Sequence, residues 1–117
     1  MKLLTKQNIK DLPKLYATEN TPTHDKVVVV KFFLPSTSIS WYAVEYSPED
    51  KMFFGYVDNA DGEWGYFSLT ELESIIGRYG LKVERDMYFP AKPFSEVVTV
   101  NRENPSFSKI ANIIKRR

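Results

Sequence analysis

Runs of β-branched and aromatic residues alternate with turn-forming segments through the first half of the chain. Residues 26–34 form one such run, which Pro35 ends, and we predict a first strand there. The same pattern predicts further strands over residues 40–46, 52–58 and 63–67. The segments between these last strands are short and rich in turn residues, so consecutive strands should pair as antiparallel hairpins.

Helical spacing occurs before and after this strand-rich region. Thr5 is placed to cap a short helix that runs to Asp11. Ser68 and Glu71 form a capping-box pattern, and apolar residues then recur at helical spacing until Gly77 or Gly80. The sequence therefore predicts one helix before the strands and one directly after them.

Two further elements are predicted toward the C-terminus. Residues 81–89 alternate in polarity like a fifth strand, which Pro90 and Pro93 would close. Asn104 and Pro105 are suited to begin a final helix with an apolar face. The elements together predict an α+β fold: an antiparallel meander of about five strands with two to three flanking helices. At 117 residues the chain should form a single domain over residues 1–117.

The predicted pairing divides the side chains of the sheet between two faces. One face is apolar and includes Phe32, Tyr42 and Phe54, so it should face the core. The other face is mixed, with the small residues Ala43 and Gly55 side by side. This mixed face is a candidate surface for binding a base, a ring or a partner side chain. Its candidate residues are Lys31, Trp41, Glu45, Trp64 and Tyr66. Alternatively, the first or the final helix covers this mixed face.

Charge is distributed unevenly along the chain. Residues 40–76 carry eight acidic side chains and one basic side chain, whereas residues 102–117 carry five basic and one acidic. A basic helix over residues 101–117 could contact a polyanion, with Lys109, Lys115, Arg116 and Arg117 as the candidate residues. Alternatively, these cations only complement the dipole at the end of a helix.

Few residues have the chemistry expected of a catalytic or metal site. The chain has no cysteine and one histidine, His24, so neither a thiolate site nor a histidine pair for a metal can form. Two acidic groups remain as candidates for metal-dependent catalysis. The first cluster of acidic residues consists of Asp58, Asp61 and Glu63 around one turn, and the second consists of Glu84 and Asp86 on either side of Arg85. The sequence predicts no catalytic residue, no metal and no cofactor.

No segment has the apolar length of a secretion signal or of a membrane span. The absence of cysteine also fits a reducing compartment. We therefore expect a cytoplasmic protein that does not contact a membrane.

Several motifs occur in an order that resembles a known family. They include Gly65-Tyr66-Phe67-Ser68-Leu69-Thr70-Glu71-Leu72-Glu73 and Glu84-Arg85-Asp86-Met87-Tyr88-Phe89. The chain resembles the small bacterial proteins catalogued as domain of unknown function 2958, from about Leu3 to Val97. The resemblance implies a setting in plasmids, phages and conjugative elements, often near DNA-processing or antirestriction genes. It implies no catalytic residues, and residues 101–117 lie outside it.

Three functions stay open at this point. The first is a non-enzymatic binding module of a bacterial mobile element, linked to DNA processing or to counter-defence. Its partner would be a protein or a nucleic acid, and the sequence does not decide between them or fix an oligomeric state. The second is a small metal-dependent carboxylate enzyme such as a nuclease or hydrolase. The third is an acidic inhibitor of a host defence nuclease, based on the charge of residues 40–76.

Overall fold

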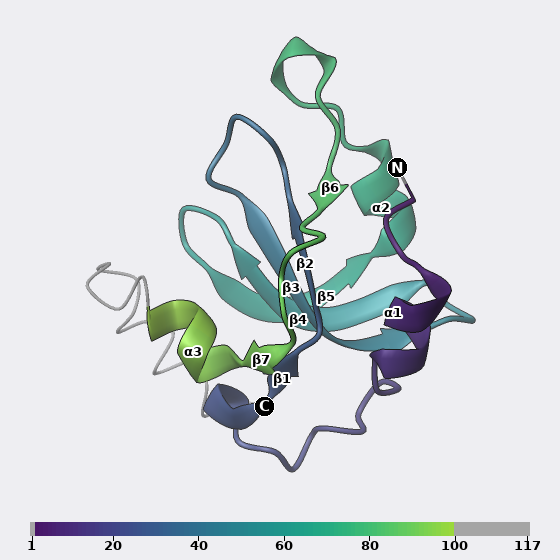
Figure 1. The fold of residues 1–117 in the computed structure, drawn as a ribbon, viewed down its shortest axis with the longest axis vertical. Coiled ribbons are helices and arrows are strands. Elements are labelled where there is room, and N and C mark those ends of the chain that lie inside the picture. The colour runs from purple at the N-terminus through teal and green to yellow at the C-terminus, as the bar shows by residue number, and fades with distance from the viewer. Residues whose placement is uncertain (1, 100–117) are drawn as a thin grey trace.

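A computed structural model describes residues 2–99 of the 117-residue chain (Figure 1). Its elements in chain order are α1 (Lys6–Asp11), η1 (Thr23–Asp25), β1 (Val27–Val28), β2 (Val30–Phe33), β3 (Ser40–Ser47), β4 (Met52–Asp58), β5 (Glu63–Ser68), α2 (Leu69–Ser74), η2 (Arg78–Gly80), β6 (Glu84–Arg85), β7 (Lys92–Pro93) and α3 (Phe94–Thr99).

The main sheet has five strands in the order β5-β4-β3-β2-β6, and every neighbouring pair is antiparallel. The consecutive strands β2, β3, β4 and β5 form a meander. After α2 the chain returns and adds β6 beside β2. A second sheet pairs β1 with β7. The predicted α+β class with an antiparallel meander is confirmed.

Both predicted helix caps are present. The Thr5 hydroxyl accepts a hydrogen bond from the Asn8 backbone N–H at 3.0 Å, and the Asn8 side chain accepts one from the Thr5 N–H at 3.0 Å. The Ser68 hydroxyl accepts the Glu71 N–H at 2.9 Å. The helix after Ser68 is shorter than predicted. It ends at Ser74, because Ile75 is extended and Ile76 forms a bridge with Lys82.

The predicted strand over residues 26–34 is interrupted at Val29. The chain before this residue leaves the main sheet, and Val27 pairs with Pro93 of β7. The predicted strand over residues 81–89 is confined to Glu84–Arg85, because a turn follows in which Phe89 N–H donates to the Asp86 carbonyl at 3.2 Å. The helix α3 was not predicted, and the helix predicted from Asn104 lies outside the described residues.

Strand register corrects the predicted division of side chains between the two faces. Lys31 lies opposite Tyr42, and Val30 lies opposite Ala43. In β3 the register shifts between Ala43 and Glu45, which is a β-bulge. A bulge places two successive residues on one face, so the alternation reverses beyond it. Before the bulge, Trp41 lies opposite Phe32 and so on the other face from Lys31 and Tyr42, and the predicted grouping of Lys31 with Trp41 on one face is wrong.

Each face of the sheet has its own buried cluster. The α2 face carries Val30, Phe32, Trp41 and Phe53, packed against Leu3, Leu4, Leu12 and Leu72. The α3 face carries Tyr42, Val44 and Tyr56, packed against Phe94 and Val97. Figure 1 shows α1 and α2 on one side of the molecule and α3 on the other. Neither face is open, but the cover on the α3 face comes from α3, a helix that was not predicted.

A long-range contact ties the N-terminal segment to β6. The Arg85 guanidinium donates hydrogen bonds from Nη1 to the carbonyl oxygens of Lys2 at 2.8 Å and of Leu3 at 2.9 Å. Leu3 is buried in the α2-face cluster. The contact therefore holds the start of the described chain against the last strand of the main sheet.

Candidate functional site

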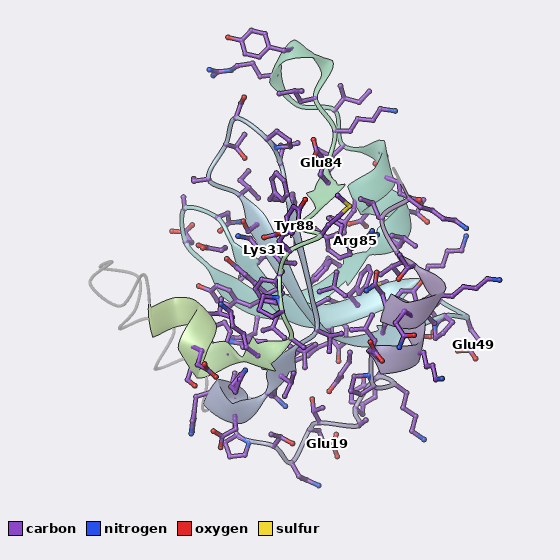
Figure 2. All side chains as sticks on the ribbon, viewed as in Figure 1. Glu19, Lys31, Glu49, Glu84, Arg85 and Tyr88 are labelled. Carbon is purple, nitrogen blue, oxygen red and sulfur yellow. The ribbon has the colours of Figure 1, made fainter. Side chains whose placement is uncertain are left out.

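A pocket of about 300 Å³ opens beside β2 and β3, on the α3 face. We call it the Tyr42 pocket. Four separate parts of the chain line it, and its residues are Lys31, Tyr42, Asp86, Tyr88, Phe89, Pro90, Lys92 and Val97. In Figure 2, Lys31 of β2 and Tyr88 of the turn after β6 lie in the same region over the sheet. The pocket depends on the tertiary fold, because residues of β2, β3 and α3 complete the lining that the segment 86–92 begins.

Two lysines of the pocket lie over aromatic rings. Lys31 Nζ is 5.7 Å from the centre of the Tyr42 ring, and Lys92 Nζ is 5.2 Å from the centre of the Phe89 ring. These distances suit cation–π contact. Within residues 2–99 neither lysine forms an ion pair. Both ammonium groups are thus available to an acidic group of a ligand.

The turn after β6 builds the outer wall of the pocket. Asp86 N–H donates to the Lys31 carbonyl at 2.9 Å, which fixes the turn to β2. The Asp86 carboxylate then accepts the Tyr88 N–H at 3.0 Å. Met87 and Tyr88 are 62% and 88% exposed. The turn is anchored at its base, and its two largest side chains point to solvent.

Burial and neighbouring carboxylates keep the phenol groups near this pocket protonated. Burial raises the pKa of the Tyr42 hydroxyl, and Asp58 raises it further, while a hydrogen bond with Ser40 opposes the rise and Asp86 adds a smaller increase. Burial, followed by Asp58, also raises the pKa of Tyr56. The Tyr42 hydroxyl, whose pKa lies above its ordinary value of 10.0, therefore stays protonated at neutral pH.

Asp58, at the end of β4, is half-buried on this face. Burial raises the pKa of its carboxyl group, and Lys31 lowers it in part. Lys31 thus has two roles, because it partly offsets the burial of the neighbouring Asp58 and presents a cation to the opening of the pocket.

The five residues predicted to form one binding face are divided by the structure. Lys31 lines the Tyr42 pocket, and Trp41 is buried in the α2-face cluster. Trp64 lies opposite Tyr56 and packs edge-on against Phe94, with ring centres 4.7 Å apart. Tyr66 is 49% exposed on the edge strand β5, where its ring contacts that of Phe54. Trp64 is therefore part of the packing and not an open stacking surface.

Glu45 was predicted to share the mixed face with Lys31, but it is fully buried and its carboxylate is bound by other residues. Its carboxylate accepts the backbone N–H of Tyr16 at 2.8 Å and that of Thr18 at 3.1 Å, together with the Thr18 hydroxyl. The Lys26 ammonium, also buried, donates to the Thr18 carbonyl and hydroxyl oxygens. This cluster has a structural role, since it fastens residues 14–20 to the bulge of β3.

The acidic residues considered for catalysis do not converge. Asp86 lines the Tyr42 pocket, whereas Glu84 lines a separate pocket of about 420 Å³ with Leu72, Lys82 and others. Asp61 and Glu63 are exposed around the β4–β5 turn. No group of three or more potential metal ligands occurs among the residues that the structure describes. His24 is exposed, and its Nε2 lies 3.5 Å from Oδ2 of Asp25, which is also exposed.

The acidic stretch of residues 40–76 does not form one surface either. Glu49 and Asp50 lie in the turn before β4, and Asp61 lies in the turn after it. The two turns are at opposite ends of the same strand. The candidate polyanion-binding residues Lys109, Lys115, Arg116 and Arg117 lie outside the described residues.

Sequence reasoning did not identify most of the Tyr42 pocket. Tyr42 was assigned to the core, and Lys92 between two prolines gave no signal at all. The one available signal was the run Asp86-Met87-Tyr88-Phe89-Pro90, in which large apolar residues stand next to a turn-forming proline. That run was interpreted as a strand, so its outward-facing side chains were not recognised.

Comparison with known proteins matches the chain to a family. A family model described as "Protein of unknown function (DUF2958)" matches residues 3–108 and so takes in part of the segment that was expected to lie outside the resemblance. No curated protein and no solved structure matches the chain. None of the helices within residues 2–99 has the length and apolar character needed to cross a bilayer. Since the family model covers most of the sequence, the chain belongs to the DUF2958 family of proteins of unknown function.

Proposed function

We propose that this protein is a non-enzymatic binding module that recognises a partner protein through the Tyr42 pocket. The observation that carries the proposal is the pocket itself. Two lysines without ion pairs within the described chain line its walls, and Tyr88, which also lines it, is largely exposed, as is the adjoining Met87. Aromatic and methionine side chains of this kind are enriched in protein interfaces.

The charge of the folded part favours a protein over a nucleic acid as the partner. Residues 2–99 contain 11 basic and 14 acidic side chains. Binding to a nucleic acid depends on a surplus of basic groups that neutralise phosphates. The pocket itself is lined by Lys31, Lys92 and the carboxylate of Asp86, which suits a partner side chain flanked by both kinds of charge.

The family resemblance supports a more specific setting for this function. A binding module carried by a bacterial mobile element would recognise a protein of that element or of its host, in DNA processing or in counter-defence. In either case the contact uses the same pocket, and the protein acts in the cytoplasm.

Site-specific photo-crosslinking tests the proposal. Benzoylphenylalanine replaces Tyr88 of the pocket, and in a matched control it replaces Tyr16, which is 58% exposed on a different segment. In cells that naturally encode the protein, we expect one protein adduct at position 88 that is absent at position 16. The adduct should disappear in the double variant Lys31→Glu, Lys92→Glu.

Two results would contradict the proposal. An adduct at position 88 that persists in the double lysine variant would show that the pocket does not select the partner. Binding of a mixed-sequence single-stranded oligonucleotide, lost in the same variant, would identify nucleic acid as the ligand of the pocket. Each variant is checked for folding by its urea unfolding curve before it is interpreted.

A further inference from the structure

A hairpin between α2 and β6 extends away from the rest of the molecule (Figure 1). Ile76 and Lys82 form a bridge at its base. Gly77 N–H donates to the Leu81 carbonyl at 2.7 Å, and Leu81 N–H donates to the Arg78 carbonyl at 3.1 Å. We call residues 76–82 the Tyr79 hairpin. Its backbone is internally hydrogen-bonded, so it presents its tip in a defined conformation.

The two residues at the tip both have left-handed backbone conformations. Tyr79 has φ 62° and ψ 21°, and Gly80 has φ 73°. Two successive left-handed residues closed by a hydrogen bond form a type I′ turn, in which asparagine or glycine is preferred at the first position. A bulky side chain there is disfavoured, because its Cβ approaches the backbone too closely. Tyr79 thus occupies the first position of this turn at a cost in stability.

No contact within the described chain offsets that cost. Tyr79 is 85% exposed and has no hydrogen bond or ring contact within residues 2–99. Tyr16 also has a left-handed conformation, with φ 70°, but its N–H is bound by the buried Glu45 carboxylate. Strained residues of this kind are concentrated at functional sites. Tyr16 has a contact that accounts for its conformation and Tyr79 has none within residues 2–99, so we infer that Tyr79 makes a contact with another molecule.

The residues around Tyr79 define the chemistry of such a contact. Ile76 is 68% exposed on the same hairpin. Arg78 and Lys82 are exposed and form no ion pairs within the described chain. The hairpin therefore presents one aromatic and one aliphatic side chain between two cations. Tyrosine and arginine, together with tryptophan, are enriched among the residues that contribute most to binding in protein interfaces.

We propose that the Tyr79 hairpin is a second docking element, which inserts Tyr79 into an apolar socket of a partner protein bordered by carboxylates. The socket would bury the tyrosine ring and pair the carboxylates with Arg78 and Lys82. The Tyr42 pocket lies on a different part of the surface and shares no residue with the hairpin. The protein then has two separate contact surfaces and joins two partners, or two regions of one partner.

The first part of the test measures the cost of Tyr79 in the free protein. Tyr79→Asn places a preferred residue in the type I′ turn, so we expect a higher urea midpoint with an unchanged slope. Ser36→Asn is the matched control, because Ser36 is an exposed turn residue with φ 65°. A lower midpoint for Tyr79→Asn would show that Tyr79 stabilises this fold from within and would overturn the proposal.

The second part measures binding in cells that naturally encode the protein. Benzoylphenylalanine replaces Ile76, which leaves Tyr79 and Arg78 in place. We expect one protein adduct, reduced about tenfold or more by Tyr79→Asn and by Arg78→Glu. Ser36→Asn should leave it unchanged. The double variant Lys31→Glu, Lys92→Glu should also leave it unchanged, and this separates failure of the hairpin from failure of the Tyr42 pocket.

Four results of this second part would overturn the proposal. The adduct could be absent, could contain a second copy of this chain, or could persist in Tyr79→Asn. The full chain could also sediment with phosphatidylserine vesicles in a Tyr79-dependent manner. That last result would identify a lipid surface as the target of the hairpin.

Discussion

Replacing Glu45 by glutamine tests whether the buried cluster at the bulge of β3 holds residues 14–20 in place. The substitution keeps the shape of the side chain and removes its charge. In the native protein both carboxylate oxygens are used, one by the Tyr16 N–H and the other by the N–H and hydroxyl of Thr18. A glutamine has only one acceptor oxygen, so its amide nitrogen must face one of these donors.

The expected loss of stability follows from these contacts. A hydrogen bond to a charged group contributes about 1.5–3 kcal/mol, and a neutral one about 0.5–1.5 kcal/mol. With the amide nitrogen turned toward Thr18, whose hydroxyl can rotate to accept from it, the bond from the Tyr16 N–H is retained and should weaken by about 1 kcal/mol. The Thr18 N–H left without an acceptor should cost about 1–3 kcal/mol. For Glu45→Gln we expect the free energy of unfolding to fall by about 2–4 kcal/mol, since the site is fully buried.

Urea unfolding followed by tryptophan fluorescence measures this change, with Glu49→Gln as the matched control. Glu49 is exposed in the turn before β4, and its substitution should change stability by less than about 0.5 kcal/mol. Amide hydrogen exchange should also accelerate at Tyr16 and Thr18. A loss below about 1 kcal/mol, or unchanged exchange at these two amides, would refute the assigned role of Glu45.

Other consequences can be tested in the same way. Ser68→Ala removes the cap of α2 and should lower stability by about 1 kcal/mol in urea unfolding, whereas an unchanged midpoint would contradict the cap. Phe54 is 4% exposed and its ring lies 5.7 Å from that of Trp64, so Phe54→Ala should cost about 3–5 kcal/mol and alter tryptophan emission. Burial raises the pKa of the Asp58 carboxyl group, so the folded state holds the carboxyl proton more tightly than the unfolded state does. The free energy of unfolding therefore falls as the pH rises above 3.8, the ordinary pKa of this group. Asp58→Asn should therefore stabilise the protein at neutral pH and lose that advantage in acid, as unfolding curves at several pH values would show. If residues 109–117 bind a polyanion, removing residues 115–117 should reduce the slope of log affinity against log salt by about 2–3, and an unchanged slope would exclude that contact.

The strands and caps could be predicted because their signals are local. The strands over residues 40–46, 52–58 and 63–67 differ from β3, β4 and β5 by at most one residue at an end. Thr5 and Ser68 have hydroxyl groups that satisfy free N–H groups at the start of a helix, and this chemistry does not depend on the rest of the fold.

The faces could not be predicted, because both sides of the sheet are buried and apolar. A polar face normally fixes the register of a strand, and here Tyr42, Ala43 and Val44 fit either side. The bulge adjoining Val44 contains no glycine or proline that would mark it. It carries Tyr46 onto the face of Trp41 and leaves Glu45 opposite Phe54. The predicted binding face was therefore divided, and only its lysine lies in the Tyr42 pocket.

The contact between Arg85 and the carbonyl groups of Lys2 and Leu3 also bears on how the protein folds during synthesis. Arg85 follows Lys2 by 83 residues and Leu3 by 82 residues in the chain. A ribosome must release most of the domain before this contact can form, although the β3–β4–β5 hairpins can pair as soon as they emerge. The N-terminal segment is synthesised first and should be among the last parts to dock. Until it does, the part of the α2 face that Leu3 covers stays exposed, and the nascent protein is more open to aggregation during this interval.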